Sequence, residues 1–257
     1  MRLGGMALPN GVLVHGPHSW ACAIRREDGT IAVASAAKRL QASRVENPFL
    51  RGPARLAEAM ALLPQVKRKL PEAQLPMQSR RVIVSMLGAV VAVKGIRGSA
   101  RLRPAAQELL AGLTSIAPAV LSLRGSELAA YHGAEHISIG SYEHGGQAAK
   151  EHERCGGHLV GPLVATSTAG NLLAGLTPPR VRRHVQAAAQ LGAIAGAMEI
   201  FGWMTRNPSH PLARALSKPG HELQHRLSTA EPSPAQLEVA EAALAACLEL
   251  EHAADRA

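Results

Sequence analysis

Residues 157–176 read GHLVGPLVATSTAGNLLAGL, twenty positions whose only ionisable side chain is that of His158. A helix that crosses a bilayer needs about 20 predominantly apolar residues, so this stretch has the length of a membrane span. Three further apolar stretches are marginal spans, because alanine contributes little transfer energy and ionisable residues are costly at depth. They are residues 82–96, 105–123 and 185–204.

The apolar stretches and the composition together predict a mainly α fold. We expect a helical membrane-associated bundle with a small N-terminal β-containing portion. Phe, Trp and Tyr occur only twice each, so small apolar side chains must fill the core, which favours close packing between helices. Periodicity alone leaves one alternative open, a soluble alanine-rich bundle with buried helices.

The chain divides into three expected parts. Residues 1–76 form an N-terminal α+β soluble portion, residues 77–206 a helical, membrane-embedded region, and residues 207–257 a C-terminal helical segment. In the first part, short apolar runs separated by a turn signal predict strands at 11–15, 20–24 and 31–34.

Helix signals are clearest at two places in these parts. A short helix is expected over residues 54–63, within a segment rich in proline. Near the C-terminus, Ser233, Pro234 and Gln236 form a capping box with proline at the first helical position. We expect an amphipathic packing helix to follow and assign it no chemical role.

Charge and cysteine content limit the classes of partner. The formal net charge of +9 suits an anionic membrane face or a nucleic acid. Few aromatic side chains are present for base stacking and no nucleic-acid motif is found, so no nucleic acid is expected as a partner. Three widely spaced cysteines do not form a disulfide framework and fit a reducing compartment. Residues 1–17 lack a sustained apolar core, so no signal peptide is expected there.

The densest group of chemical side chains lies in residues 131–158. Ser126 can cap a helix in which His132 and His136 lie one turn apart on the same face, so both imidazoles can reach one ion. Glu135 is close enough to act as a general base on water. Residues 132–136, His-Gly-Ala-Glu-His, also fit the H-x-x-E-H pattern of inverted zinc proteases. This match is a weak signal without a further acidic ligand.

A second cluster follows in the same segment. Cys155 is a soft ligand once ionised, His152 lies three residues before it, and Glu143 supplies a hard ligand. The mixed donor set predicts a divalent metal, zinc in competition with iron. Arg154, beside Cys155, is a candidate catalytic residue that would lower the pKa of the thiol or clamp an anionic substrate.

Two alternative interpretations stay open for these histidines. They can cap helices and form hydrogen bonds in a polar loop without binding a metal. His15 and His18, which flank Gly16 and Pro17, are expected to be turn residues, with approach to the metal cluster as the alternative.

The chain resembles the YqhQ-like family, a bacterial domain of unknown function described as predicted metal-dependent enzymes. The central segments that carry the resemblance are Tyr131–His136 and His152–Gly156. Flanking segments that also match are Gly4–Ala7, Asn10–Val12, Gly16–Pro17, Leu50–Gly52, Pro219–Gly220, Leu227–Thr229 and Glu231–Pro232. The family commonly has a lysine after the second motif histidine, where this chain has Ile137. The resemblance implies an integral membrane protein with several helices and a soluble N-terminal portion.

These observations favour a metal-dependent hydrolase of unknown substrate in the bacterial cytoplasmic membrane, as a multi-pass protein. His132, His136 and Cys155 would bind the ion, His152 or Glu143 would complete the ligand set, and Glu135 would be the general base. Membrane lipid is the expected partner, and a homo-oligomer is an open possibility. The alternative is a non-enzymatic membrane scaffold or assembly factor in which the histidines are structural. Charge alone would also allow a soluble RNA-associated protein.

Overall fold

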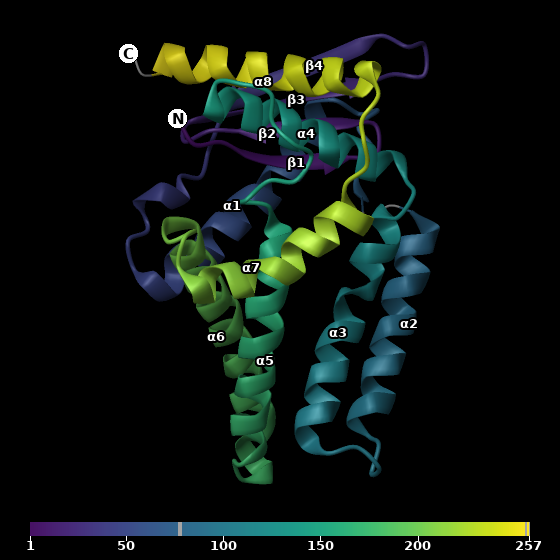
Figure 1. Ribbon diagram of the computed structural model, residues 1–257, viewed down its shortest axis with the longest axis vertical. Helices are drawn as coiled ribbons and strands as arrows, with labels where there is room; N and C mark the ends of the chain where they lie inside the picture. The colour runs from purple at the N-terminus through teal and green to yellow at the C-terminus, as the bar shows by residue number, and fades with distance from the viewer. Residues whose placement is uncertain (77–78, 255, 257) are drawn as a thin grey trace.

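The computed structural model describes residues 1–76, 79–254 and 256. Residues 77–78, at the expected boundary between the first two parts, and residues 255 and 257 lie outside the described residues. Figure 1 shows a layered body built around a sheet and, below it, an arm of long helices. The body comprises the sheet with α1, α4 and α8, and the arm comprises α2, α3, α5 and α6.

The sheet is a four-stranded antiparallel meander in the order β1-β2-β3-β4. The strands are β1 (Gly4–Leu8), β2 (Gly11–His15), β3 (Ser19–Arg25) and β4 (Ile31–Ala37). The three predicted strands are therefore confirmed, while β1 was not predicted. Gly29 has a φ of +84° in the turn between β3 and β4, a conformation that glycine adopts without a steric penalty.

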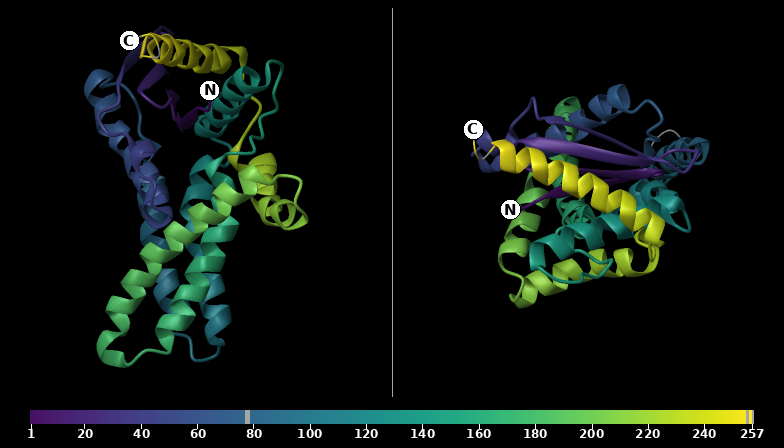
Figure 2. Two further views of the ribbon diagram at one scale, coloured as in Figure 1. Left: turned by 90° about the vertical axis from the view of Figure 1, so that its left-hand side faces the viewer. Right: turned by 90° about the horizontal axis from the view of Figure 1, so that it is seen from above.

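Both faces of the sheet are buried, and alternation along the strands divides the apolar side chains between two layers. Val12 and Val14 face α4 (Glu127–His144) and α8 (Pro234–Ala254), which cover one face. Leu13 faces the opposite layer, formed by α1 (Pro48–Lys69). The views in Figure 2 place α8 across the sheet with α4 beside it. The two ends of the chain therefore meet in one body.

Helix α1 is much longer than the helix predicted over residues 54–63, so that boundary prediction was wrong. It begins at Pro48, where the side chain of Asn47 accepts a hydrogen bond from the backbone N–H of Phe49. Pro53 and Pro64 lie inside the helix, although proline removes a backbone donor. Burial of its apolar residues against the sheet outweighs this loss, because Leu62 and Val66 are fully packed in the second layer.

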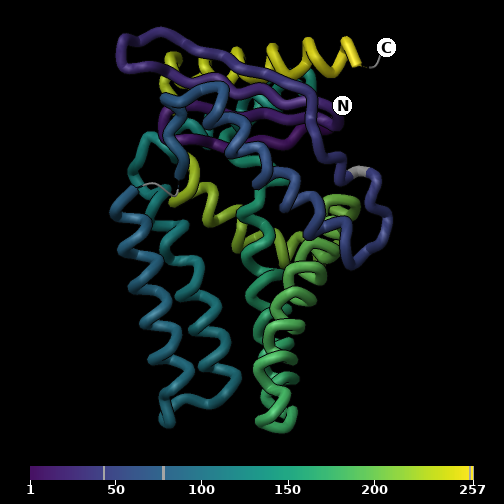
Figure 3. Tube along the Cα trace, turned by 180° about the vertical axis from the view of Figure 1, so that it is seen from behind, coloured from purple at the N-terminus to yellow at the C-terminus, as the bar shows by residue number. Residues whose placement is uncertain are grey.

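The arm consists of two helical hairpins. One hairpin joins α2 (Arg80–Arg97) to α3 (Pro104–Leu123), and the other joins α5 (Val160–Gly175) to α6 (Pro179–Arg206). Figure 3 shows both hairpin turns at the end farthest from the sheet. The mainly α prediction is confirmed, with a small N-terminal sheet.

Within the described part of the chain, one helix is long and apolar enough to span a membrane. It is α3, with a mean hydropathy of 1.3 and only 11% of the span buried, and not the stretch at 157–176. That stretch forms a turn of 3-10 helix, η3 (Gly156–Leu159), followed by the 16 residues of α5. The expectation of several spans is therefore not supported by length and composition.

The C-terminal segment contains α7 (Pro211–Leu223), a π turn η4 (Gln224–Ser228), and α8. One half of the predicted capping box is present, because the side chain of Gln236 accepts a hydrogen bond from the backbone N–H of Ser233 at 2.8 Å. The Ser233 hydroxyl donates to the same oxygen at 3.0 Å, and the backbone N–H of Gln236 donates to the Ser233 carbonyl. The prediction missed the most buried polar group of α8, Glu251, whose exposure is 0%.

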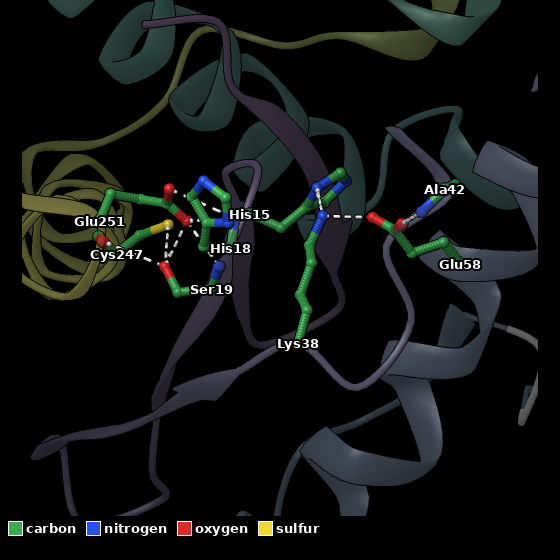
Figure 4. Close-up of polar contacts among 8 residues, drawn as sticks. All are labelled: His15, His18, Ser19, Lys38, Ala42, Glu58, Cys247 and Glu251. Atoms are coloured by element: carbon green, nitrogen blue, oxygen red, sulfur yellow. Dashed lines mark hydrogen bonds and ion pairs between the residues drawn. The ribbon is translucent and has the colours of Figure 1, made fainter. Parts of the chain in front are cut away.

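Glu251 fixes the turn between β2 and β3. Its carboxylate accepts hydrogen bonds from the backbone N–H of His18 at 2.9 Å, the backbone N–H of Ser19 at 2.5 Å and the Ser19 hydroxyl at 2.6 Å (Figure 4). A Cβ at Gly16 would lie 2.6 Å from this carboxylate, so only glycine permits the approach. The last turns of α8 thereby hold the chain directly after His15.

We predict that Glu251→Ala lowers the free energy of unfolding by roughly 2–4 kcal/mol, because buried donors lose their acceptor. Urea unfolding in mild detergent, followed by the fluorescence of the buried Trp20, measures this change. Glu249→Ala, a substitution of an exposed carboxylate on the same helix, is the control and should change stability by less than about 0.5 kcal/mol. Equal stability of the two variants would contradict a structural role for Glu251.

Candidate metal centre

Helix α4 supplies four of the candidate residues, His132, Glu135, His136 and Glu143, and begins where the sequence predicts. The side chain of Ser126 accepts a hydrogen bond from the backbone N–H of Ala129 at the helix N-terminus. The helix packs on β1 and on α8, so its face with His132, Glu135 and His136 turns toward the interior. Glu135 and His136 are buried, with exposures of 7% and 2%.

Backbone carbonyl groups fix both imidazoles of α4. His132 Nδ1 donates a hydrogen bond to the Ser228 carbonyl at 2.8 Å, and His136 Nδ1 donates to the Lys150 carbonyl at 2.5 Å. A carbonyl oxygen only accepts, so each Nδ1 carries the proton and each Nε2 keeps a free lone pair. This is the usual arrangement of a histidine that ligates a metal through Nε2. The rings lie 4.3 Å apart between centroids.

Cys155 completes a group of three donors. Its Sγ lies 3.4 Å from His132 Nε2, and the donor atoms of His132, His136 and Cys155 all lie within 4.8 Å of one another. Two ligands of a tetrahedral zinc ion, at bond lengths of about 2.0 Å to nitrogen and 2.3 Å to sulfur, are separated by about 3.5 Å. The three donors fit a zinc ion in chemistry, and the 3.4 Å between Cys155 Sγ and His132 Nε2 matches this separation.

Burial keeps these groups uncharged when no cation is nearby. It lowers the pKa of His136 to about 2, aided by the charge of His132, and it lowers the pKa of His132. Burial raises the pKa of the Cys155 thiol to about 12, against a hydrogen bond from the backbone N–H of Gly157. Neutral imidazoles are ready ligands, whereas a thiolate at this depth requires a compensating cation.

Glu135 opens onto a cavity of about 160 Å³ beside the three donors. The cavity is also lined by His15, His152 and Arg154. Among the described residues, none donates a hydrogen bond to the Glu135 carboxylate, and burial raises its pKa to about 8. A divalent ion nearby would favour the ionised carboxylate. Glu135 therefore faces the cavity with a carboxyl group that is available to act as an acid or a base.

The other predicted site residues form a polar network next to the cavity. The Glu143 carboxylate accepts hydrogen bonds from the Arg154 guanidinium and from the backbone N–H of Leu3 at 3.2 Å. Its second oxygen lies 3.4 Å from His152 Nε2. Burial raises the pKa of Glu143, but the Arg154 hydrogen bond and charge outweigh burial and hold the pKa below its ordinary value.

His152 is oriented toward this network, away from the three-donor group. Its Nδ1 accepts a hydrogen bond from the backbone N–H of Arg154 at 3.3 Å, so its proton lies on Nε2, which faces Glu143. The structure therefore brings His132, His136 and Cys155 together and places His152 and Glu143 beside them as partners of Arg154. The other two histidines of residues 131–158 lie outside the three-donor group. His144 donates a hydrogen bond to the Gly140 carbonyl within α4, and His158 donates to the Ser217 carbonyl.

Several residues that shape the site were not predicted from the sequence. Gln224, fully buried in the π turn, accepts a hydrogen bond from the backbone N–H of His152 at 2.8 Å and lies 3.0 Å from His158 Nε2. Gly5 leaves room for Glu135, because a Cβ there would lie 2.2 Å from the carboxylate. Gly220 similarly leaves room for the His158 ring.

The segments that carry the family resemblance are the signal that points to these residues. Gly4 and Gly5 line the cavity, Ser228 holds His132, and Pro219–Gly220 packs beside His158. Segments far apart in the sequence thus meet at the three-donor group and beside it, and the close approaches require glycine at Gly4, Gly5 and Gly220.

Comparison with known proteins finds a family model that matches part of the chain. Residues 126–250 match the model of a family described as "Protein of unknown function (DUF1385)". No curated protein and no solved structure matches the chain significantly. The matched region contains His132, Glu135, His136 and Cys155. The three-donor group thus lies within the part of the chain that is similar to DUF1385, and the YqhQ-like resemblance is consistent with this match.

Proposed function

We propose that this protein is a membrane-associated, metal-dependent hydrolase. His132, His136 and Cys155 hold a divalent ion, with zinc as the best fit to two imidazoles and a thiolate. Glu135 acts as the general base. The substrate belongs to a class that hydrolysis can cleave, such as an ester or a phosphoester.

This proposal depends on one observation: three possible metal ligands lie beside the Glu135 carboxylate, which accepts no hydrogen bond from another described residue. Structural zinc sites have four protein ligands, whereas catalytic sites commonly have three and leave one position open. Three donors converge here, and Glu135 faces the same cavity without a hydrogen-bond partner among the described residues. When bound, zinc supplies Lewis acidity and lowers the pKa of water to about 7.

The chain's own residues would divide the remaining work. In the ionised form that a nearby divalent ion favours, Glu135 would take the proton from the attacking water. Arg154, held by Glu143 and by a hydrogen bond to the Leu3 carbonyl, would orient an anionic group of the substrate. His152 would keep Glu143 in place from its other oxygen.

A non-enzymatic scaffold is the second candidate, and one observation favours it. The hydrogen bonds of His132 and His136 tie α4 to two separate segments, at Ser228 and at Lys150. Such ties would stabilise the body even without a metal. This candidate assigns no task to Glu135, which separates it from the hydrolase.

Membrane association is proposed for the arm. Helix α3 has the length and hydropathy of a span and is mostly unburied. Helix α2 presents Val84, Leu87 and Val91, which are 63–70% exposed and share one helical face. Exposed apolar surface on this scale marks an interaction site, and a bilayer is an occupant that suits two antiparallel helical hairpins.

Four polar side chains of the arm satisfy one another in a way that suits this environment. Glu108 pairs with Arg97 at 2.8 Å and accepts a hydrogen bond from Asn171 at 2.7 Å. Asn171 in turn accepts from Gln190 at 2.9 Å. One residue from each of the four helices takes part, so these groups need no water as a partner.

We predict that purified protein binds one zinc ion per chain and that His132→Ala or Cys155→Ser weakens binding. Loss of a ligand should exceed the roughly 10–100-fold cost of losing an outer partner. Titration with a chromophoric zinc competitor measures the affinity. His221→Ala, at an exposed histidine on α7, is the control and should bind zinc as the wild type does.

Glu135→Gln completes this experiment by separating the two candidate functions. The hydrolase predicts normal zinc affinity and a roughly 10²–10⁴-fold loss of hydrolysis on a panel of nitrophenyl esters and phosphates. Unchanged activity would leave the scaffold as the better account. Absence of bound zinc in the wild type would contradict both the metal and the hydrolase.

A second prediction concerns the arm. Leu87→Glu/Val91→Glu should reduce recovery in the membrane fraction, since each buried charge costs about 2.5–3.5 kcal/mol at the centre of a span. Fractionation after carbonate and high-salt washes measures this recovery. Leu40→Glu, at an exposed apolar residue of the body, is the control and should stay with the membrane. Wild-type protein released by the washes would contradict insertion of the arm.

A further inference from the structure

His15 lies outside the three-donor group but lines the same cavity. It is the last residue of β2, and its ring lies over Gly4 of the neighbouring strand β1. A Cβ at Gly4 would lie 2.7 Å from His15 Nε2, so glycine alone leaves room for this nitrogen. Both residues belong to the cavity wall, together with Arg154 and His136. His15 thus approaches the site, and His18 is exposed in the turn that follows.

A buried lysine determines which nitrogen of His15 carries the proton. Lys38 Nζ lies 3.0 Å from His15 Nδ1 and forms an ion pair with the Glu58 carboxylate (Figure 4). The ammonium group of lysine can only donate, so Nδ1 accepts and the proton lies on Nε2. Glu58 is itself held by the backbone N–H of Ala42, and the side chain of Lys38 is only 3% exposed. The arrangement is therefore rigid.

The same contacts keep the ring neutral. Burial and the positive charge of Lys38 together lower the pKa of His15 to about 4, against the opposing charge of Glu58 and a hydrogen bond to the Gly16 backbone. Because Nδ1 of the neutral imidazole already accepts a hydrogen bond from Lys38, the ring can form one further hydrogen bond, as a donor through Nε2–H. No side chain among the described residues accepts a hydrogen bond from this Nε2–H.

We propose that His15 is a ligand-binding residue whose Nε2–H donates a hydrogen bond to an oxyanion bound beside the metal group. Lys38 and Glu58 are positioning residues, because they fix the proton on Nε2. The identity of the ligand class follows from the wall of the cavity, where His15 and Arg154 both present N–H donors. A phosphate or carboxylate end group offers the oxygen acceptors that these donors require.

The size of the cavity limits how much of a ligand it can hold. At about 160 Å³ it is smaller than the roughly 300–1,000 Å³ of pockets that enclose a drug-sized molecule. It therefore holds the reacting end of a larger substrate. A donor fixed before the ligand arrives stabilises negative charge on oxygen without reorganisation, which is the requirement for an oxyanion in hydrolysis. A catalytic role for His15 rests on the proposed function, but binding of an oxyanion by His15 can be tested separately.

The first experiment measures binding of inorganic phosphate and, in a second arm, acetate to the full chain loaded with zinc in mild detergent. Calorimetry should show that His15→Phe weakens binding of the preferred anion at least 10-fold. His15→Gln, which retains an N–H donor, should recover part of this loss. His18→Phe, at the exposed histidine of the same turn, is the control and should bind as the wild type does. Zinc affinity should be equal in all four proteins.

A second measurement tests the positioning residues without zinc. The ¹⁵N spectrum of labelled histidine should show His15 with its proton on Nε2 in the wild type. The double variant Lys38→Met/Glu58→Gln, which avoids an unpaired buried charge, should shift the proton partly to Nδ1. It should also weaken anion binding.

The outcomes distinguish this inference from the proposed function. Zinc binding with equal anion affinity in wild type and His15→Phe would overturn the role of His15 and leave the metal centre intact. Failure of both anions to bind, or a wild-type proton on Nδ1, would also overturn it. Absence of zinc binding would instead overturn the proposed function, and the proton position on His15 would still decide the inference on the donor.

Discussion

Two hydrogen bonds from histidine side chains to backbone carbonyl groups determine the chemistry of the whole site. The carbonyl groups of Ser228 and Lys150 hold the Nδ1 protons of His132 and His136, so both Nε2 lone pairs converge with Cys155. Rotation of either ring would remove a donor and leave a buried polar group unpaired. The fold therefore has to bring the segments around residues 150 and 228 to α4 together. The loop after α4 and the π turn after α7 do this.

Glycine residues allow these distant segments to come so close. Gly133 of α4 faces the Ala230 carbonyl, to which a Cβ would lie within 2.2 Å. Gly5 and Gly4 play the same part for Glu135 and His15 on the opposite wall. The body is thus assembled from both ends of the chain around one helix, while the arm between them is built largely from its own hairpin contacts.

Local signals were sufficient to predict the elements whose reasons lie within a few residues. The strands at 11–15, 20–24 and 31–34, the cap at Ser126 and the capping box at Ser233 all follow from alternation or local hydrogen bonds. The density of imidazole and thiol side chains likewise identified the three donors. Spacing could not show that Glu143 faces Arg154, since the choice depends on Leu3, 140 residues away.

Tertiary packing decided the features that the sequence did not predict. Strand β1 contains two glycines and is recognisable only from its pairing with β2. Helix α1 continues past Pro53 and Pro64 because the sheet buries it. A turn of 3-10 helix before Val160 leaves α5 with 16 residues, fewer than a span needs. Glu251 and His15 looked like ordinary helix and turn residues, yet each has partners supplied by a distant segment.

X-ray absorption spectroscopy at the zinc edge tests the central claim most directly. For the zinc-loaded wild type, the account predicts one sulfur neighbour at about 2.3 Å and two imidazole nitrogens at about 2.0–2.1 Å, with a light atom in the remaining position. Cys155→Ser should remove the sulfur shell and leave the imidazole signals. A shell of six oxygen atoms, or a spectrum unchanged by Cys155→Ser, would contradict a metal centre formed by His132, His136 and Cys155.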